Sequence, residues 1–207
     1  MYNLVKPIQV QEQLLKRKIH LFSTREFAAI FSLNEFQTEY SLQELLKEGL
    51  LERIKRGLYI LKTNSPNEKE IANILYKPSY ISFDYALSYY NLIPEIVYEV
   101  TSATTKTTRL FTTNNLNFGY YTIKTQAYTG YELKEEGETK FLIAEPEKAV
   151  VDYVYALTLG QRGLLGRRNL NDRLNIKNLS KEKIKSYALI FESKKLDIWI
   201  NKLLNNK

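Results

Sequence analysis

The stretch 23–61 most constrains what this chain can fold into, because it carries the start and stop signals of two short helices in succession. Ser23 followed by Glu26 forms a capping box, which predicts a helix start. After a short polar break, a second helix is predicted over 35–48, and Gly49 supplies the left-handed residue that commonly follows a helix. We therefore predict a helix-turn-helix.

Two short apolar runs follow the second predicted helix. They cover 50–54 and 58–61, and Lys55, Arg56 and Gly57 stand between them. This pattern predicts a tight basic hairpin. A helix-turn-helix followed by such a hairpin is typical of winged helix proteins. In these proteins the second helix enters the DNA major groove, and we expect the hairpin tip to lie against phosphates.

The second predicted helix has two different faces on a helical wheel. The face expected to pack inward carries Thr38, Leu42, Leu45 and Leu46. The face expected to point outward carries Gln37, Tyr40, Ser41, Glu44 and Lys47. Four glutamates make the helix acidic, and Glu44 would repel phosphates unless it accepts a hydrogen bond from the amino group of cytosine. A module that binds only protein, or a small helical core with a solvated hairpin, stays open as an alternative.

The charge of the chain is unevenly distributed. The net charge of +7 divides into +3 over 1–62, −4 over 63–159 and +8 over 160–207. A basic tail after an acidic middle favours a polyanionic partner, although the same charge also serves solubility. The densest basic cluster consists of Arg162, Arg167, Arg168 and Arg173. It is either a second surface for nucleic acid or a protein partner, since guanidinium groups bind phosphate bidentately, or a solvated loop and helix start.

Composition excludes several kinds of chemistry. The chain has no cysteine, which rules out disulfides, thiol catalysis and thiolate metal sites, and which fits a reducing, cytoplasmic location. We find no uncharged apolar run of about eighteen residues and no secretory signal, so no membrane partner is expected. His20 is the only histidine, and no glycine-rich phosphate loop occurs. We expect no cofactor, no metal and no enzymatic activity.

The polar, proline-containing segment 62–69 predicts a domain boundary. Residues 1–62 would form the winged helix domain, and 70–207 an α+β domain with a basic C-terminal helical region. A further helix is expected within 1–20, packed behind the helix-turn-helix. Its imperfect apolar stripe consists of Ile8, Leu14, Leu15 and Ile19.

The second predicted domain mixes short helices and strands. Helices are expected over 70–76, from Ser79 or Ser82 onward, from 144 through 157, over 181–191 and over 196–204. Strands are expected over 96–101, 118–128 and 139–143 as an antiparallel group, with turns at Gly130 and Gly137. The fold class is therefore α+β, an N-terminal winged helix-turn-helix followed by a mixed domain with antiparallel strands and C-terminal helices.

Charged residues open the helix that begins near residue 144. Glu145, Glu147 and Lys148 are expected to form a helix-start charge pattern on a salt-bridged surface, because their spacing does not fit an Asp and Glu-x-Lys nuclease motif. Asp152 can pair with Lys148 at i, i+4. Six tyrosines are expected to pack half-buried with wet hydroxyls, although aromatics beside basic residues can also stack nucleobases. They are Tyr80, Tyr85, Tyr89, Tyr90, Tyr120 and Tyr121.

Three segments in this order resemble the AbiEi family. They are LLERIKRGLYIL at 50–61, YISFDYALSYYNLIPE at 80–95 and FLIAEPEKAVVDYV at 141–154. AbiEi proteins are the antitoxin and transcriptional-regulator components of bacterial abortive-infection, or type IV toxin–antitoxin, systems of phage defence. The resemblance covers about 20–160.

The resemblance implies a function. Such proteins bind inverted repeats upstream of their own operon and repress it, and they counteract a nucleotidyltransferase toxin without the need for a stable complex. The winged helix would bind operator DNA, and the later domain would supply the antidote activity. The DNA-facing residues carried onto this chain are Thr24, Arg25, Gln37, Thr38, Tyr40, Ser41, Lys55 and Arg56. A monomer that binds two half-sites cooperatively and a dimer fit the sequence equally.

Overall fold

The chain divides into two units, Met1–Asn67 and Glu68–Lys207, in a computed structural model that describes residues 5–113, 116–137, 139–160 and 170–205. Each unit has its own sheet and its own core. Among the helices of the described ranges, none combines the length and the apolar character that a membrane crossing requires.

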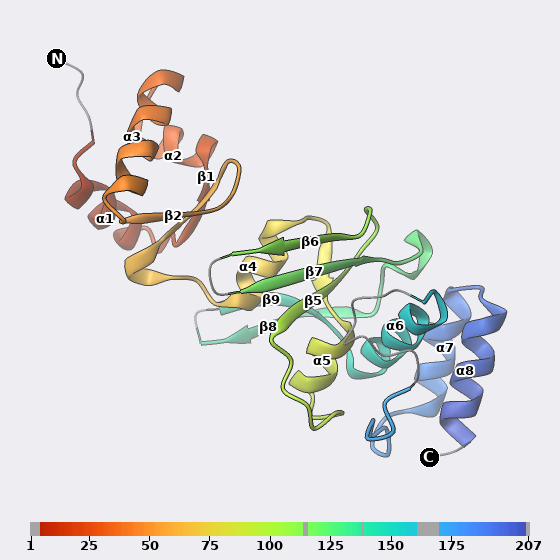
Figure 1. The fold of residues 1–207 in the computed structure, drawn as a ribbon. Coiled ribbons are helices and arrows are strands. Elements are labelled where there is room, and N and C mark those ends of the chain that lie inside the picture. Colours follow the sequence, from red (N-terminus) through yellow and green to blue (C-terminus); the bar gives the residue numbers. More distant parts are fainter. Residues whose placement is uncertain (1–4, 114–115, 138, 161–169, 206–207) are drawn as a thin grey trace. The chain divides into compact units, whose positions relative to one another are not determined.

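The first unit is a helix-turn-helix followed by a hairpin, hereafter the wing. Its elements are α1 (Pro7–Lys16), β1 (Leu21–Ser23), α2 (Thr24–Phe31), α3 (Glu35–Lys47), β2 (Leu51–Lys55), β3 (Leu58–Leu61) and the short 3₁₀ helix η1 (Lys62–Asn64). The wing consists of β2 and β3. The three strands of the unit form an antiparallel sheet in the order β1-β3-β2 (Figure 1). The sequence pattern did not indicate β1, which is only three residues long.

Two reciprocal caps set the starts of α2 and α3. Ser23 Oγ accepts from the Glu26 backbone N–H at 3.2 Å, and the Glu26 carboxylate accepts from the Ser23 N–H at 2.6 Å. Asn34 and Gln37 exchange the same two bonds at 2.9 and 3.1 Å. The capping residues satisfy backbone donors that a helix start leaves without partners. The predicted starts of both helices are therefore confirmed.

The core of the first unit is aromatic at its centre. Phe22 stacks on Phe27 and on Tyr59 with centroid distances of 5.6 and 6.2 Å. Helix α1 covers this core with Val10 and Leu14, which are both fully buried. The apolar stripe predicted for this helix was wrong in two positions, because Ile8 and Leu15 are 59% and 39% exposed. The i, i+4 pair that packs inward is Val10 and Leu14, which turns Ile8 and Leu15 away.

The second unit is a six-stranded mixed sheet with helices. Its elements are α4 (Glu68–Leu75), β4 (Ser79–Ile81), α5 (Phe83–Tyr89), β5 (Glu99–Thr104), β6 (Arg109–Thr112), β7 (Asn117–Thr122), η2 (Thr125–Ala127), β8 (Tyr131–Glu136), β9 (Thr139–Ala144), α6 (Pro146–Thr158), α7 (Lys181–Ile190) and α8 (Lys194–Asn205). The strand order is β6-β7-β5-β4-β9-β8, and α6, α7 and α8 pack together beside the sheet (Figure 1). The predicted α+β fold class is confirmed.

Three details of this sheet differ from the prediction. The pairs β4–β9 and β5–β7 are parallel, so the strands are not a purely antiparallel group. Of the two predicted helix starts, Ser82 is the cap of α5, whereas Ser79 begins the buried strand β4. Strand β8, which the sequence pattern did not predict, lies between the predicted turns at Gly130 and Gly137. It is an edge strand, and its charged, half-exposed residues obscure the alternation of apolar and polar residues that would indicate a strand.

Helix α6 is buried on all sides from Glu147 to Thr158, so the prediction that Lys148 lies on a salt-bridged surface was wrong. Lys148 and Asp152 are 1% and 0% exposed, since α5, α7 and α8 pack around the helix. Their predicted i, i+4 pairing is confirmed. Asp152 also accepts hydrogen bonds from the Tyr80 hydroxyl at 2.9 Å and from Ser82 Oγ at 2.8 Å. Burial lowers the pKa of Lys148, and the charge of Asp152 opposes that shift.

Several tyrosines of the second unit pack in its core. Tyr80, Tyr120 and Tyr121 are at most 2% exposed, and their hydroxyls donate to Asp152, to the carbonyl of Ala72 and to Glu99. Burial is the main reason why the pKa of each of these tyrosines is raised. The expected packing role is confirmed for these three, but their hydroxyls bond to protein groups.

Candidate nucleic-acid interface

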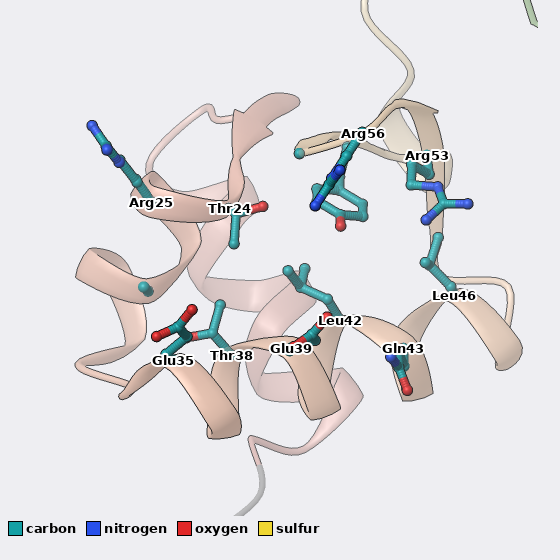
Figure 2. Close-up of a pocket in the computed structure, with 13 residues that line it drawn as sticks. Thr24, Arg25, Glu35, Thr38, Glu39, Leu42, Gln43, Leu46, Arg53 and Arg56 are labelled. Carbon is teal, nitrogen blue, oxygen red and sulfur yellow. The ribbon is translucent and has the colours of Figure 1, made fainter.

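A groove of about 580 Å³ lies between α3 and the wing in the first unit (Figure 2). Its floor is apolar and includes Ala28, Leu42 and Leu46. The wing is held to the start of α2 by a hydrogen bond from the Thr24 N–H to the carbonyl of Gly57 at 3.2 Å. Gly57 has φ +77°, a left-handed conformation that a tight turn needs and that glycine adopts without strain. The groove is therefore built from three anchored elements.

The two walls of the groove carry opposite charges. Arg25 from α2 and Arg53 and Arg56 from the wing form the basic wall. Glu35, Glu39 and Gln43 form the other wall, at i, i+4 and i+8 of α3 (Figure 2). Within the described ranges no ion pair joins the two walls.

This arrangement suits a nucleic-acid duplex. Guanidinium groups without a carboxylate partner are available to phosphate oxygens, which they bind bidentately. Carboxylates and amides on a helix can accept from cytosine or pair with adenine in the major groove. The arginine wall can therefore position a backbone while α3 presents groups that distinguish bases.

Four of the eight predicted DNA-facing residues line the groove. They are Thr24, Arg25, Thr38 and Arg56. Figure 2 shows the Arg56 side chain directed into the space above α3, whereas Arg25 points away from its centre. Tyr40 is 43% exposed on α3 but lies outside the groove lining. Lys55 is half-buried and does not line the groove either.

Three predicted residues of α3 are buried or take part in its N-terminal cap. The prediction that Ser41 points outward was wrong, because it is 3% exposed. Thr38 is 2% exposed and its hydroxyl donates to the carbonyl of Asn34 at 2.7 Å, so its polar group is already used. The side-chain oxygen of Gln37 accepts from the Asn34 N–H in the cap. The buried stripe of α3 is Thr38, Ser41, Leu42 and Leu45.

Sequence reasoning missed Arg53 and the three groove-facing residues of α3. Strict alternation along β2 would bury Leu51 and Arg53 on one face. The register shifts between Arg53 and Lys55, so a bulge lets Leu51 and Ile54 both point inward and leaves Arg53 exposed. The i, i+4 spacing of Glu35, Glu39 and Gln43 was the available signal for the acidic wall.

Glu44, which was predicted to repel phosphates unless it accepts from cytosine, pairs with a lysine in the structure. Lys47 Nζ lies 2.7 Å from the Glu44 carboxylate. This hydrogen bond raises the pKa of Lys47 and offsets the charge of Glu44. The acidic groups that face the groove are instead Glu35 and Glu39.

The predicted second basic surface is only partly described. Arg162, Arg167 and Arg168 lie outside the described residues. Arg173 is 65% exposed at its side chain and pairs with Glu95 at 2.7 Å. The Glu95 carboxylate partly offsets the charge of Arg173, and Asn171 Nδ2 donates to the same carboxylate at 3.1 Å.

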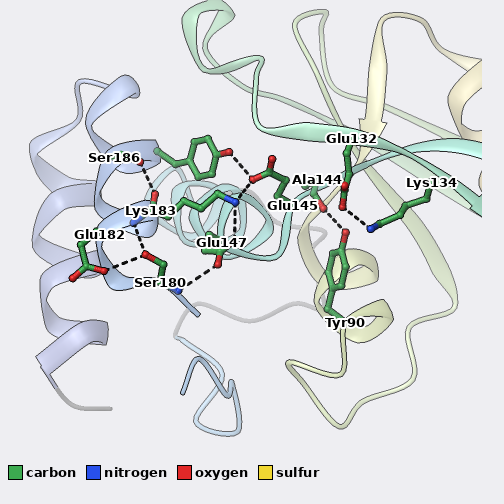
Figure 3. A network of polar contacts seen from close by, with 11 residues as sticks. Tyr90, Glu132, Lys134, Ala144, Glu145, Glu147, Ser180, Glu182, Lys183 and Ser186 are labelled. Atoms are coloured by element: carbon green, nitrogen blue, oxygen red, sulfur yellow. Dashed lines mark hydrogen bonds and ion pairs between the residues drawn. The ribbon is translucent and has the colours of Figure 1, made fainter. Parts of the chain in front are cut away.

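The glutamates at the start of α6 form a clamp with α7 (Figure 3). Lys183 Nζ lies 2.5 Å from Glu145 and 3.5 Å from Glu147, and the Tyr187 hydroxyl donates to Glu145 at 2.8 Å. The hydrogen bond from Lys183 is the main cause of the lowered pKa of Glu145, and burial raises the pKa of Tyr187 to about 12. These contacts accord with the predicted helix-start charge pattern for Glu145 and Glu147.

The fold and the groove define the first unit as a winged helix-turn-helix of the type that binds DNA. Residues 9–62 match the family model described as transcriptional regulator, AbiEi antitoxin. The resemblance seen in the sequence is confirmed for this region, and the match supports a DNA-binding antitoxin and regulator. No curated protein matches the chain.

Proposed function

We propose that the chain represses its own operon by binding inverted repeats in operator DNA and that it counteracts a nucleotidyltransferase toxin. The family match over 9–62 supports a regulator of this kind. The observation that carries the DNA-binding part is the groove, whose basic wall faces the helix that a winged helix protein presents to the major groove. No catalytic step is assigned to either unit.

In this proposal the two walls have separate tasks. Arg53 and Arg56 hold phosphates at the edge of the major groove, which fixes the register of the protein on the duplex. Glu39 and Gln43 then lie next to base edges, where a carboxylate accepts from cytosine N4 and an amide pairs with adenine. The carboxylates also repel phosphates, so they disfavour any binding register on the duplex in which α3 contacts the DNA backbone instead of the base edges.

Fluorescence anisotropy with the duplex upstream of the protein's own gene tests the proposal directly. The native duplex and a scrambled duplex would be compared across a salt series. We expect tighter binding to the native repeat at every salt concentration, because base contacts distinguish sequences whereas phosphate contacts do not. Equal affinity for both duplexes would leave only phosphate attraction, and no binding at low salt would overturn the proposal.

A second candidate is a protein-interaction module that neutralises a partner enzyme without specific DNA binding. The outward part of α3 favours this candidate, since Phe36 and Tyr40 are 64% and 43% exposed beside the acidic wall. Reporter repression and rescue from the neighbouring gene product separate the two. If Arg56→Ala abolishes repression and leaves rescue intact, DNA binding is the task of the first unit.

A further inference from the structure

A second cluster of basic and aromatic side chains lies in the other unit, where β5 passes into the edge strand β6. We call it the β5–β6 corner, and it consists of Tyr76, Lys77, Lys106, Arg109 and Phe111. Lys77, Lys106 and Arg109 are exposed, and the two aromatic residues are half-buried. Neither the winged helix groove nor the core of the unit uses these side chains.

The aromatic rings of the corner form a platform beneath the cations. Tyr76 and Phe111 lie 5.8 Å apart, and both contact the buried ring of Tyr120 at 5.2 and 5.7 Å. Lys106 Nζ and the Arg109 guanidinium lie 5.5 and 5.7 Å from the centre of the Tyr76 ring. Both cations therefore sit at cation–π distance from one half-buried ring.

The cations of the corner differ from the paired lysines on the neighbouring elements of this unit. On β8, β9 and α4, lysines pair with glutamates at 2.5 to 2.7 Å. Within the described ranges, neither Lys106 nor Arg109 has a carboxylate partner, and the Lys106 ammonium donates to the carbonyl of Lys77. The reason lies in the sequence, because residues 100–131 contain no Asp or Glu although 63–159 as a whole is acidic.

The loop that carries these cations is held by threonine hydroxyls. Thr104 Oγ1 donates to the carbonyl of Pro78 at 2.7 Å and accepts from the Lys106 N–H at 3.2 Å. Thr122 Oγ1 donates to the carbonyl of Lys106 at 2.7 Å, and the Tyr76 hydroxyl donates to the carbonyl of Thr107 at 3.1 Å. The cations are thus placed before any ligand arrives, which lowers the entropic cost of binding.

We propose that the β5–β6 corner binds single-stranded nucleic acid. Lys106 and Arg109 would contact phosphates of the strand, and an unpaired base would stack on the layer formed by the Arg109 guanidinium and the Tyr76 ring. Arginine planes and aromatic rings both stack bases without regard to sequence. A base within a duplex has no free face to offer this platform, so an unpaired base is the ligand that fits.

The test uses the full chain carrying Arg53→Ala and Arg56→Ala, which weakens the groove of the first unit as a second source of binding. Labelled oligo-dT and oligo-rU of twelve nucleotides and a duplex of equal length are the probes, measured by anisotropy across a salt series. We expect both single strands to bind more tightly than the duplex. Equal or tighter duplex binding, or no single-strand binding at low salt, overturns the proposal. The comparison of the two single strands shows whether the ligand is DNA or RNA.

Variants of the corner then locate the site. Adding Lys106→Ala and Arg109→Ala should weaken single-strand binding at least tenfold. It should also reduce the salt slope, the slope of log affinity against log salt concentration, by about 1.4 in magnitude, since each phosphate contact with a single strand contributes roughly 0.7. The matched control, Lys134→Ala with Lys140→Ala, removes two paired lysines of the same unit and should change affinity less than twofold. If control and corner variants lose affinity equally, the corner is not the site.

The proposed stacking of a base on the Tyr76 ring is tested by a matched pair of variants. Tyr76→Phe keeps the ring but loses the hydroxyl that bonds to Thr107, so it should weaken binding less than Tyr76→Leu does. Tyr76→Leu removes the ring and should weaken binding about tenfold at an unchanged salt slope. Circular dichroism melting of each variant verifies that the unit remains folded. Equal affinity of the folded leucine and phenylalanine variants overturns the stacking contact.

Discussion

Helices α3 and α6 have the same length and each carries a lysine–carboxylate pair within the helix, yet one pair is exposed and the other is buried. Each helix has 13 residues. In α3 the pair is Glu44 and Lys47, with side chains 39% and 71% exposed. In α6 it is Lys148 and Asp152, at 1% and 0%. The presence of a charge pair along a helix therefore does not show whether the pair lies at the surface or in the core. The elements that pack around the helix determine that.

The difference in burial determines whether the charges of each helix contribute to binding or to stability. An exposed pair is screened by water and adds little to folding, so the charges around α3 are available for binding. A buried pair adds little net stability compared with apolar residues, but removing one partner leaves an unpaired charge in the core. We therefore expect substitutions around α3 to change affinity and substitutions in α6 to change stability.

The largest expected effect comes from Asp152→Ala. It leaves the Lys148 ammonium buried without its counter-charge, and the Tyr80 and Ser82 hydroxyls without their shared acceptor. We expect the free energy of unfolding of the second unit to fall by about 3–5 kcal/mol. Urea denaturation followed by circular dichroism measures this loss, and a loss below about 1 kcal/mol would contradict the buried-pair interpretation.

A double substitution provides the control for that result. Lys148→Met combined with Asp152→Leu replaces both charges by apolar groups and should recover the part of the loss that the unpaired ammonium causes. The Tyr80 and Ser82 hydroxyls stay without their acceptor in both variants. If the double variant is as unstable as the single one, these hydroxyls and the packing around α6, rather than the charge, explain the loss.

The next largest effect should appear in DNA binding rather than in stability. Arg53→Ala and Arg56→Ala remove exposed groups of the basic wall. We expect each to weaken operator binding about tenfold and to reduce the salt slope by about 0.9, the contribution of one phosphate contact. Surface changes of this type should shift the free energy of unfolding by no more than about 0.5 kcal/mol.

Lys140→Ala is a suitable control for the arginine variants, because it removes an exposed lysine of the second unit that pairs with Glu135. It should leave operator affinity unchanged. If Lys140→Ala and Arg56→Ala weaken binding equally, the net charge of the chain rather than the groove governs affinity.

Local signals predicted the first unit well. The capping boxes at Ser23 and Asn34, and Gly49 after α3, are short-range features, so the sequence is enough to locate them. The groove was harder to predict. The helical wheel predicts that Ser41 faces outward, but its burial depends on what packs against α3. The bulge that exposes Arg53 follows from pairing with β3 and leaves no mark in the sequence.

In the second unit, the features that the sequence did not predict depend on contacts between residues far apart in the chain. Strand β4 is only three residues long, and its partners β5 and β9 lie far along the chain. The burial of Lys148 requires α7 and α8, which follow it by more than thirty residues. Charge pattern alone indicates a surface for such a residue, because lysine is rarely buried without a partner.

A smaller effect is expected from the cap of α2. Ser23→Ala removes the acceptor for the Glu26 N–H and one half of the capping box. The free energy of unfolding of the first unit should fall by about 1 kcal/mol, the usual cost of losing an N-cap side chain. Ser23→Asp retains an acceptor and should lose less than half as much in the same urea titration. Equal losses would assign the effect to packing near Phe22 instead.

The smallest effect, and the one with a defined pH dependence, is expected at the clamp between α6 and α7. Lys183 lowers the pKa of Glu145 below its ordinary value of 4.5, chiefly by a hydrogen bond, and the same bond raises the pKa of Lys183. A carboxylate with a lowered pKa stabilises the folded state above pH 4.5, and that stabilisation is lost as the pH falls through the lowered value.

Lys183→Met should therefore cost stability at pH 7 but not in acid. The side chains of Lys183 and Glu145 are 43% and 28% exposed, so solvent screening limits the cost to about 1 kcal/mol or less. Parallel urea titrations at pH 7 and pH 3 measure the difference between the variant and the original chain, which should shrink at the lower pH. A difference that is the same at both values would mean that Lys183 acts through the packing of its methylene groups, and α6 would then depend on α7 for burial and not for charge.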